Sequence, residues 1–369
     1  MVHSFPVIMV TRKFAIKFIF AAVLICACFI ILYVAPRLLT KPSPRGGLGL
    51  NLTPKYVLTW TPFFGDVDYI PSGQLESTKC GGISIPPCVV TSNRSLLNES
   101  DLVIFHMRDI RADDLPAERP PGQRWALLDY EAPPHTPRVP DVLKGTFNWT
   151  ITYRQDSDVN VLPQLRRADA PDQMAKPFNW WTDKTRHVLW LVSNCKTPSN
   201  REGFVQELRK FIQVDVVGQC GHLSCLPKMS ADCYHNASKV YFFYLALENS
   251  ICTDYITEKF YNALTWGMVP IVMSGANYTS VAPPRSYIDA LSFQNVRHLA
   301  DHLKQIAKDP LLYNSYHAWR QRYKIVWRPF QCNLCQMLHE QSPPRMYEDI
   351  NAWWFMKASC KRWMKTSQH

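Results

Sequence analysis

The chain has 369 residues, of which 47% are hydrophobic, 12% aromatic and 19% charged. These fractions exclude an intrinsically disordered protein, and the length allows two domains of roughly 150 residues. The net charge of +11 suits an anionic partner, namely nucleic acid, membrane headgroups or a phosphate-bearing substrate, without choosing among them. The 12 cysteines exceed what a reduced cytosolic enzyme usually carries, so we expect an oxidising compartment.

The first feature along the chain is an uncharged apolar run at residues 18–35, with basic residues on both sides. These eighteen residues are long enough to cross about 30 Å of hydrocarbon as one helix. We therefore predict a cytosolic tail at residues 1–17 and a transmembrane signal anchor at residues 18–35; the alternative is a cleaved signal peptide. Residues 36–54 are rich in Pro and Gly without periodicity, which predicts a short stem.

Glycosylation sequons indicate the orientation of this anchor. The basic residues are nearly balanced on its two sides, so charge counting does not decide. Six N-x-S/T sequons and ten cysteines lie on its C-terminal side, which favours a lumenal C-terminal region. The sequons are Asn51, Asn93, Asn98, Asn148, Asn236 and Asn277. We therefore expect a single-pass type II membrane protein of the Golgi, with its catalytic body in the lumen.

Beyond the stem, short apolar runs alternate with amphipathic segments. The runs contain few polar residues, as in strands buried on both faces of a parallel sheet. Strands are predicted at residues 56–60, 102–105, 125–128, 187–192, 214–217, 240–247 and 269–273. Helices are predicted at residues 203–212, 255–264 and 296–306. Strand–helix alternation occurs twice, with a break near residues 169–185, which predicts two α/β domains.

Several common motifs are absent from the sequence. It contains no G-x-G-x-x-G or G-x-x-x-x-G-K-[ST] fingerprint and no H-E-x-x-H or G-x-S-x-G, so dinucleotide and P-loop sites lack support. Two D-x-D patterns, at residues 66–68 and 156–158, could hold Mg²⁺ or Mn²⁺ beside a nucleotide diphosphate. Such tripeptides are common, and we favour a role in solvated turns or salt bridges.

Residues 241–275 form the most informative segment, with the predicted order strand, polar loop, helix and strand. Glu248, Asn249 and Tyr255 follow a buried strand, and ligands of open α/β sheets bind at that end. Lys259 lies in the first turn of the helix, where the free N–H groups and the dipole favour an anion. The alternative from the pattern alone is a capped helix with a solvated Glu–Lys pair.

The run E-N-S-x₃-D-Y-I-T-E-K-F-Y-N-A-L-x₂-G-x-V-P in this segment resembles the donor-binding signature of the α1,3-fucosyltransferases, which use GDP-fucose. Further segments are similar to that family in the same order, over about residues 55–340. They are residues 88–106, 130–137, 147–159, 191–201, 213–221 and 332–339. The resemblance implies an α/β fold of the GT-B type, in which two Rossmann-like domains face across a cleft.

The resemblance also implies a division of the chain after the stem. The expected parts are an acceptor-side domain at residues 55–175, a GDP-fucose-binding domain at residues 176–330, and a cysteine-containing segment at residues 331–369 that packs back on the first domain. Cys332 and Cys335 form a C-x-x-C that could also indicate zinc or redox chemistry. In a lumenal protein whose first domain contains only Cys80 and Cys88, we favour two disulfides between these pairs, with the connectivity open.

The expected activity is inverting transfer of L-fucose from GDP-β-L-fucose, in α1,3 linkage, to GlcNAc of a glycoprotein or glycolipid glycan. Glu131 matches the family's proposed general base, although Ala132 stands where the family usually has Ser. Arg201 and Lys259 match its phosphate-contacting cations, with Arg209 as a nearby competitor of Arg201. The expected donor-binding residues are Ser193, Asn194, Arg201, Glu248, Asn249, Tyr255, Glu258 and Lys259.

The resemblance implies that no cofactor or metal is required, which returns both D-x-D patterns to a structural role. The expected partners are GDP-fucose, a GlcNAc-containing glycan and a membrane through the anchor, and nucleic acid is no longer expected. Two alternatives stay open: a type II transferase that uses another nucleotide sugar, and a glycan-binding pseudo-transferase without activity. The acceptor class, N-glycan core or antenna, is left open by the sequence.

Overall fold

The computed structural model describes residues 52–168, 178–225, 230–340 and 345–365. In these ranges no helix combines the length and the apolar character needed to cross a bilayer. The predicted tail, the anchor at residues 18–35, nearly all of the stem and the sequon Asn51 lie outside the described residues, as does about half of the predicted interdomain break. Pro54–His369 forms one unit.

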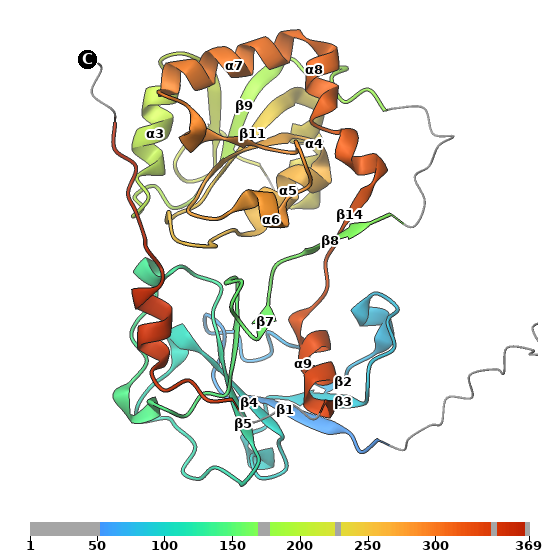
Figure 1. The fold of residues 1–369 in the computed structure, drawn as a ribbon, viewed down its shortest axis with the longest axis vertical. Coiled ribbons are helices and arrows are strands. Elements are labelled where there is room, and N and C mark those ends of the chain that lie inside the picture. The colour runs from blue at the N-terminus through green and yellow to red at the C-terminus, as the bar shows by residue number, and fades with distance from the viewer. Residues whose placement is uncertain (1–51, 169–177, 226–229, 341–344, 366–369) are drawn as a thin grey trace, which may run out of the picture. The chain divides into compact units, whose positions relative to one another are not determined.

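The first sheet has seven strands in the order β2-β3-β1-β4-β5-β6-β7 (Figure 1). They are β1 (Lys55–Thr59), β2 (Gly73–Gln74), β3 (Cys88–Thr91), β4 (Leu102–His106), β5 (Arg124–Leu128), β6 (Trp149–Thr152) and β7 (Val159–Asn160). Every pairing is parallel except that of β2 with β3. Every residue of β4 is buried, because this central strand is covered on both faces.

The connections of this sheet differ from the prediction. Among residues 52–168 they contain no α-helix, so the expected strand–helix alternation is wrong for this sheet. Short 3₁₀ turns take its place: η2 (Ser77–Cys80), η3 (Arg94–Leu96), η4 (Met107–Asp109), η5 (Pro133–His135) and η6 (Asp141–Leu143). Proline pairs such as Pro133-Pro134 favour turns over helices because proline cannot continue the hydrogen-bond ladder.

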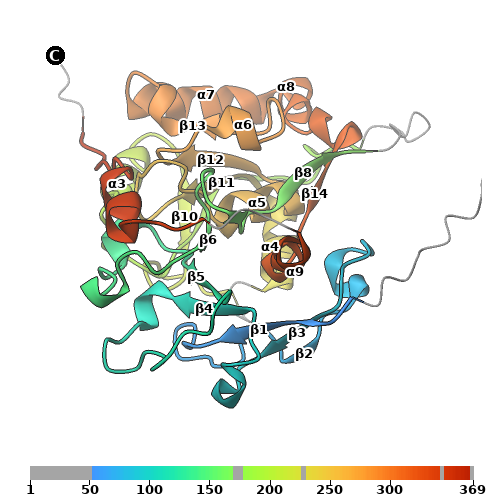
Figure 2. The ribbon, with the colours of Figure 1, turned by 60° about the horizontal axis from the view of Figure 1, so that its bottom comes forward.

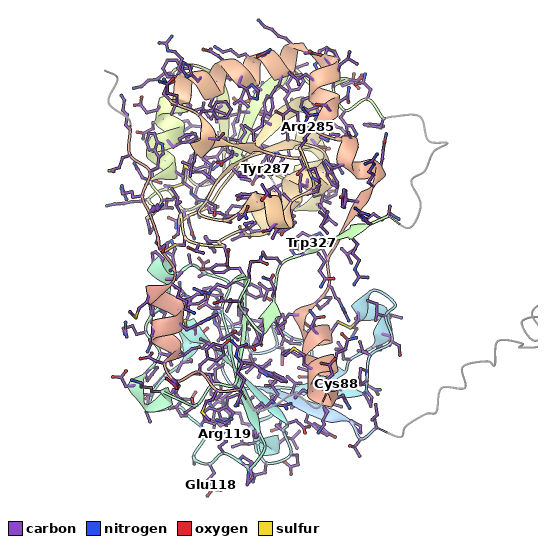
Figure 3. All side chains as sticks on the ribbon, viewed as in Figure 1. Cys88, Glu118, Arg119, Arg285, Tyr287 and Trp327 are labelled. Atoms are coloured by element: carbon purple, nitrogen blue, oxygen red, sulfur yellow. A yellow bond between two sulfur atoms is a disulfide. The ribbon has the colours of Figure 1, made fainter. Side chains whose placement is uncertain are left out.

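Residues near the C-terminus cover both faces of the first sheet. Helix α9 (Phe330–His339) packs on one face, where two disulfides join it to the sheet region: Cys80–Cys332 and Cys88–Cys335 (Cys88 is labelled in Figure 3). This pairing confirms the expected ties between the two cysteine pairs. Tyr347, Trp353 and Trp354 pack on the other face, the last two from the π-helical turn η9 (Ala352–Met356).

The second sheet is parallel throughout and has the order β10-β9-β11-β12-β13. Its strands are β9 (Arg186–Leu191), β10 (Val214–Val217), β11 (Tyr241–Leu247), β12 (Val269–Met273) and β13 (Ile288–Asp289). All four of the strands predicted here are present, and the runs at residues 214–217 and 269–273 coincide with β10 and β12.

Helices cover both faces of this sheet, as Figures 1 and 2 show. One face carries α3 (Arg201–Leu208), α7 (Val296–Lys308) and α8 (Pro310–Ser315), and the other carries α4 (Ala231–Val240), α5 (Glu258–Trp266) and α6 (Tyr278–Val281). Helix α5 ends at Gly267, which has φ +84° and lies so close to Trp180 that a Cβ atom would be 2.2 Å from its ring. This arrangement is a doubly wound α/β domain.

Two antiparallel strands lie where the chain passes between the sheets. Strand β8 (Gln164–Arg167) follows the first sheet and pairs with β14 (Tyr323–Val326), which follows the second. The remaining turns are η7 (Ala290–Ser292) and η8 (Ala318–Gln321). The outgoing and returning segments are thus hydrogen-bonded to each other.

The two interleaved disulfides, Cys80–Cys332 and Cys88–Cys335, lead to a prediction about stability. We expect Cys80→Ser/Cys332→Ser to lower the free energy of unfolding by roughly 3 kcal/mol, because with Cys88–Cys335 intact the second cross-link closes a ring of only about a dozen residues. Removing both disulfides also opens the loop that Cys88–Cys335 closes, whose ends are 247 residues apart. This second removal is expected to lower the free energy of unfolding by several kcal/mol more. Urea unfolding followed by tryptophan fluorescence measures both losses; equal losses in the two variants would contradict the expectation.

Candidate functional site

The second sheet changes its winding direction between β9 and β11. Strand β10 lies beside β9, and β12 lies beside β11, so the crossovers diverge at this point. Ligands of open α/β sheets bind at such a switch point, beyond the carboxyl ends of the strands. Half-buried Ser193 and exposed Asn194 follow β9, and Glu248 and Asn249 follow β11. The two loops of predicted donor residues therefore lie at one edge of the sheet.

Glu131 approaches this edge from the loop after β5 of the first sheet. Its Oε2 atom accepts hydrogen bonds from Asn249 Nδ2 at 3.0 Å and from the Tyr255 hydroxyl at 3.3 Å. The carboxylate is half-buried, and no described residue donates a hydrogen bond to Oε1. The predicted base is thus in direct contact with two of the predicted donor residues.

Asp129, which was not predicted as a site residue from the sequence, holds the backbone of Glu131 in place. Its Oδ1 atom accepts a hydrogen bond from the Glu131 backbone N–H at 2.7 Å, and the side chain is fully buried. Oδ2 has no hydrogen-bond partner among the described residues. Burial raises the pKa of the Asp129 carboxyl to about 8, so it is mainly protonated at neutral pH. The only signal in the sequence is its place at the end of a buried strand, two residues before Glu131.

A second unpredicted group, His106, lies at the carboxyl end of β4. Its ring is fully buried, with Nδ1 2.5 Å from Asp109 Oδ2 and its centroid 4.2 Å from that of Phe63. Burial lowers the pKa of His106, although Asp109 opposes the shift. Because β1 and β4 flank the switch point of the first sheet, the position of His106 as the last residue of a central strand could have identified it from the sequence.

Glu248 is buried beneath the N-terminus of α5. It accepts hydrogen bonds from the Thr257 N–H at 2.8 Å, the Thr257 hydroxyl at 2.9 Å and Lys259 Nζ at 3.2 Å. Its side chain has no exposed surface, and burial raises its pKa against the opposing effect of Lys259. In this structure Glu248 fixes the first turn of the helix, and its carboxylate does not face solvent.

Lys259 lies between two carboxylates. Its Nζ atom is 3.2 Å from Glu248 and 3.3 Å from Glu258, whose side chain is 45% exposed. Burial by itself would lower the pKa of Lys259, but the two carboxylates outweigh it and the pKa is raised. The ammonium group therefore stays charged and lies close to the surface at the start of α5.

Arg201 is the buried first residue of α3. Its guanidinium donates to the Leu247 carbonyl at 2.7 Å and to the Asn194 carbonyl at 3.2 Å, one at the end of β11 and one in the loop after β9. Nε has no partner among the described residues. Arg201 therefore joins the end of β11 to the loop after β9 and retains one unused N–H group. Arg209, the alternative candidate from the sequence, lies at the C-terminal end of α3.

The D-x-D carboxylates bind protein groups. Asp156 receives two hydrogen bonds from Arg154, both at 2.8 Å, and Asp158 receives one from the Tyr347 hydroxyl at 2.9 Å. Asp66 accepts from the Asp68 N–H at 3.0 Å within a turn. In the part of the chain that the structure describes, no three His, Cys, Asp or Glu residues gather as a metal site.

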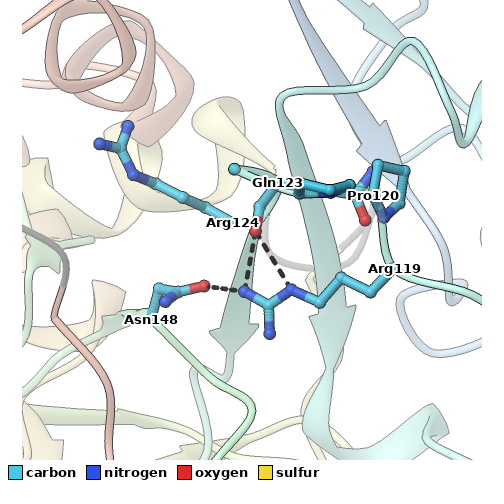
Figure 4. A pocket seen from close by; sticks show the side chains of 7 residues that line it. Arg119, Pro120, Gln123, Arg124 and Asn148 are labelled. Carbon is cyan, nitrogen blue, oxygen red and sulfur yellow. Dashed lines mark hydrogen bonds between the residues drawn. The ribbon is translucent and has the colours of Figure 1, made fainter.

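The described sequons differ in their surroundings. Four of them are exposed: Asn93, Asn98, Asn236 and Asn277. Asn148 lines a surface pocket, where its Oδ1 accepts from the Arg119 guanidinium (Figure 4) and from the Trp125 N–H at 2.9 Å. Its Nδ2 donates to the Arg345 carbonyl at 2.9 Å. The Asn148 amide is thus engaged on both sides in the folded protein.

A doubly wound α/β sheet whose switch point meets a carboxylate from a second, largely parallel sheet defines a GT-B-like glycosyltransferase architecture. Residues 181–353 match the C-terminal model of glycosyltransferase family 10 (fucosyltransferase), and residues 52–163 match the N-terminal fucosyltransferase model. The chain belongs to this family.

Individual relatives agree with this assignment. Alpha-(1,3)-fucosyltransferase C of Drosophila melanogaster is 34% identical over 329 residues, which are 81% of this chain and 77% of that protein. The 4-galactosyl-N-acetylglucosaminide 3-alpha-L-fucosyltransferase 9 of Cricetulus griseus is 32% identical over 356 residues, 90% of this chain and 95% of that protein. Crystal structures of α1,3-fucosyltransferase, alone and with GDP, share the fold with a TM-score of 0.50 at 14% and 16% identity, each over 79% of this chain and 92% of the other.

The buried ion pair of the site leads to a second prediction. We expect Lys259→Met to lower the free energy of unfolding by about 3 kcal/mol or more, because Glu248 would remain buried without a counter-ion. The double variant Glu248→Gln/Lys259→Met is expected to regain part of that loss. Lys210→Met, which breaks an exposed pair with Glu207, is the control and is expected to cost less than about 1 kcal/mol. Denaturant unfolding measures all three; similar losses in Lys259→Met and the control would refute the buried-pair interpretation.

The neutral Asp129 carboxyl leads to a prediction about pH. Folded and unfolded chains both hold its proton below pH ~4, but at higher pH only the unfolded chain loses it, so stability falls as the pH rises toward 8. Asp129→Asn cannot ionise and keeps the acceptor for the Glu131 N–H. We expect it to be more stable than the parent by roughly 4 kcal/mol at pH 7 and by less than half of that at pH 5.

Melting temperatures at pH 5 and pH 7 measure this difference. The exposed Asp141→Asn is the control and is expected to change little at either pH. A stability gain for Asp129→Asn that is the same at both pH values would mean that Asp129 is already ionised in the folded protein.

Proposed function

We propose that this fucosyltransferase moves L-fucose from GDP-β-L-fucose, with inversion, in α1,3 linkage to GlcNAc of a glycoprotein or glycolipid glycan. The observation that carries the proposal is the pair of hydrogen bonds from Asn249 and Tyr255 to Glu131. They bring a candidate base to the edge where an α/β domain binds its ligand. The matched relatives named as 3-fucosyltransferases support the linkage, and the α1,3-fucosyltransferase crystallised with GDP supports the nucleotide.

The proposed reaction is a direct displacement at the anomeric carbon of fucose. The acceptor 3-hydroxyl forms the new C–O bond while its proton passes to Glu131, and the bond from the anomeric carbon to the diphosphate breaks with its electron pair going to GDP. Asn249 and Tyr255 donate only to Oε2, so Oε1 is the atom that takes the proton. Asp129 keeps the loop in place through its bond to the Glu131 N–H.

The departing diphosphate needs positive charge and hydrogen-bond donors. Lys259 supplies a charged ammonium near the surface at the N-terminus of α5, and Arg201 supplies its unused Nε–H at the switch point. In this proposal Glu258, which is exposed beside Lys259, accepts hydrogen bonds from the ribose hydroxyls of GDP. No cofactor takes part in the proposed reaction.

We further propose that residues 55–175 and 176–330 are the acceptor-side and donor-side domains, and that the chain is a type II Golgi membrane protein anchored by residues 18–35. The positions of the two sheets support the domain division. Five disulfides among the described residues support an oxidising lumen. Release by cleavage after the apolar run is the alternative to a permanent anchor.

The role of Glu131 is tested by a charge-removing substitution. We expect Glu131→Gln to lower kcat by at least ~10²-fold and to change the KM for GDP-fucose little, because a glutamine keeps the hydrogen bonds but cannot take a proton. Glu118→Gln is the control and is expected to keep full activity, because Glu118 is exposed and lies at the end of the first domain that is away from the second sheet (labelled at the bottom of Figure 3).

Fucose transfer to an array of GlcNAc-containing glycans measures this effect. Unchanged turnover in Glu131→Gln would remove Glu131 from its role. Transfer from a different nucleotide sugar would establish the other donor class, and binding of glycans without any transfer would establish the pseudo-transferase.

A further inference from the structure

The C-terminal segment beyond η9 lies along the loops of the candidate site. The family model ends at residue 353, so residues 357–365 lie outside the matched region. Figure 1 shows this segment leaving η9 and running toward α3. We call residues 357–365 the C-terminal strap.

The first half of the strap pairs with the loop after β11. The Thr253 N–H donates to the Ala358 carbonyl at 2.8 Å, and the Lys361 N–H donates to the Ile251 carbonyl at 2.7 Å. Ile251 and Lys361 form an antiparallel bridge. The strap is therefore hydrogen-bonded to the residues between Asn249 and Tyr255.

A disulfide lies inside this pairing. Cys252 is fully buried, belongs to the same hydrophobic cluster as Tyr255, and is bonded to the exposed Cys360 of the strap. The two residues are 108 positions apart in the chain. The cross-link thus fixes the strap to the loop covalently.

The second half of the strap pairs with the loop after β9. The Trp363 N–H donates to the Ser199 carbonyl at 3.0 Å, and its carbonyl accepts from Asn200 Nδ2 at 3.1 Å. The Trp363 ring meets Phe204 of α3 edge-on, with centroids 5.4 Å apart. Asn200 has φ +58°, a conformation that is uncommon outside glycine, and it immediately precedes Arg201.

We propose that the C-terminal strap positions the two loops of the donor site. The loops also bond to each other, since the Ser199 N–H donates to the Asn249 carbonyl at 3.0 Å and its hydroxyl donates to the Glu248 carbonyl at 2.8 Å. Irregular loops that must be ordered on binding weaken affinity, and loops ordered beforehand do not incur that cost. By holding both loops, the strap keeps Asn249, Tyr255 and Arg201 in their binding positions before the donor arrives.

The consequence for donor binding rests on the proposed function, whereas the ordering of the loops does not. Two measurements keep these statements apart: hydrogen exchange of peptides covering residues 197–202 and 248–256, and the KM for GDP-fucose against kcat. The test variant is Cys360→Ser in the full chain. The matched control is Cys225→Ser/Cys233→Ser, which removes a different disulfide of the same α/β domain.

We expect Cys360→Ser to speed exchange in both peptides by roughly tenfold, and to raise the KM for GDP-fucose by about three- to tenfold with kcat within about twofold. The control is expected to leave both readouts unchanged. A purely structural role would lower the melting temperature and leave the KM of the folded fraction as it was. Where Cys360→Ser does not accumulate as folded protein, Trp363→Ala, which keeps the disulfide, is expected to shift the same readouts in the same direction.

Exchange and KM that both match the parent in the strap variant overturn the proposal. So does faster exchange in these two peptides that the disulfide control reproduces. If the parent protein transfers no fucose, the proposed function fails, and hydrogen exchange still decides whether the strap orders the loops.

Discussion

The structure depends on a contact of about 3 Å between a carboxylate of one sheet and an amide of the other. The hydrogen bond from Asn249 to Glu131 brings together a loop after β5 and a loop after β11, and neither sheet contains both partners. Such a hydrogen bond forms only if supporting residues fix the position of each loop to within a fraction of an ångström. Asp129 does this for Glu131, and the bond between the Ser199 N–H and the Asn249 carbonyl does it for Asn249. In our proposal the C-terminal strap serves the same requirement.

The sequence predicted the parts of the fold that rest on local composition. Strand β12 is an uninterrupted apolar run and β10 is apolar except for Asp215, so their limits could be predicted to the residue, and all seven predicted strands are present. Strand β6 was missed because its apolar residues alternate with threonine. Strand β3, with two valines between a cysteine and a threonine, was missed as well. Among residues 52–168 the helices expected between strands are absent, because residues of α9 and η9, more than 150 positions away, cover that sheet. When residues distant in the sequence cover a sheet, the sequence near its strands contains no helical pattern that would predict the covering.

The same distinction applies to the site. A motif identified the chemical types, and the structure brings Glu131, Asn249 and Tyr255 together. The motif did not indicate that Glu248 and Arg201 are buried, because burial depends on which residues pack against them in the fold. Nor did the net charge of +11 locate the cations: Lys259 is held between two carboxylates, and Arg201 is held by backbone carbonyls. Specific partners, and not overall charge, prepare this edge for an anion.

The late return of the chain to its first sheet has a consequence for biosynthesis. When Cys80 and Cys88 leave the ribosome, their partners are still 252 and 247 residues away. At about 5–20 residues per second, those partners follow only after roughly 12–50 s. During that interval the first sheet lacks α9 and the tryptophans of η9, and both thiols are open to incorrect pairing. Folding of the first sheet is therefore completed only after α9 and η9 have been made, because its two faces are covered, and its two cysteines paired, by residues near the C-terminus.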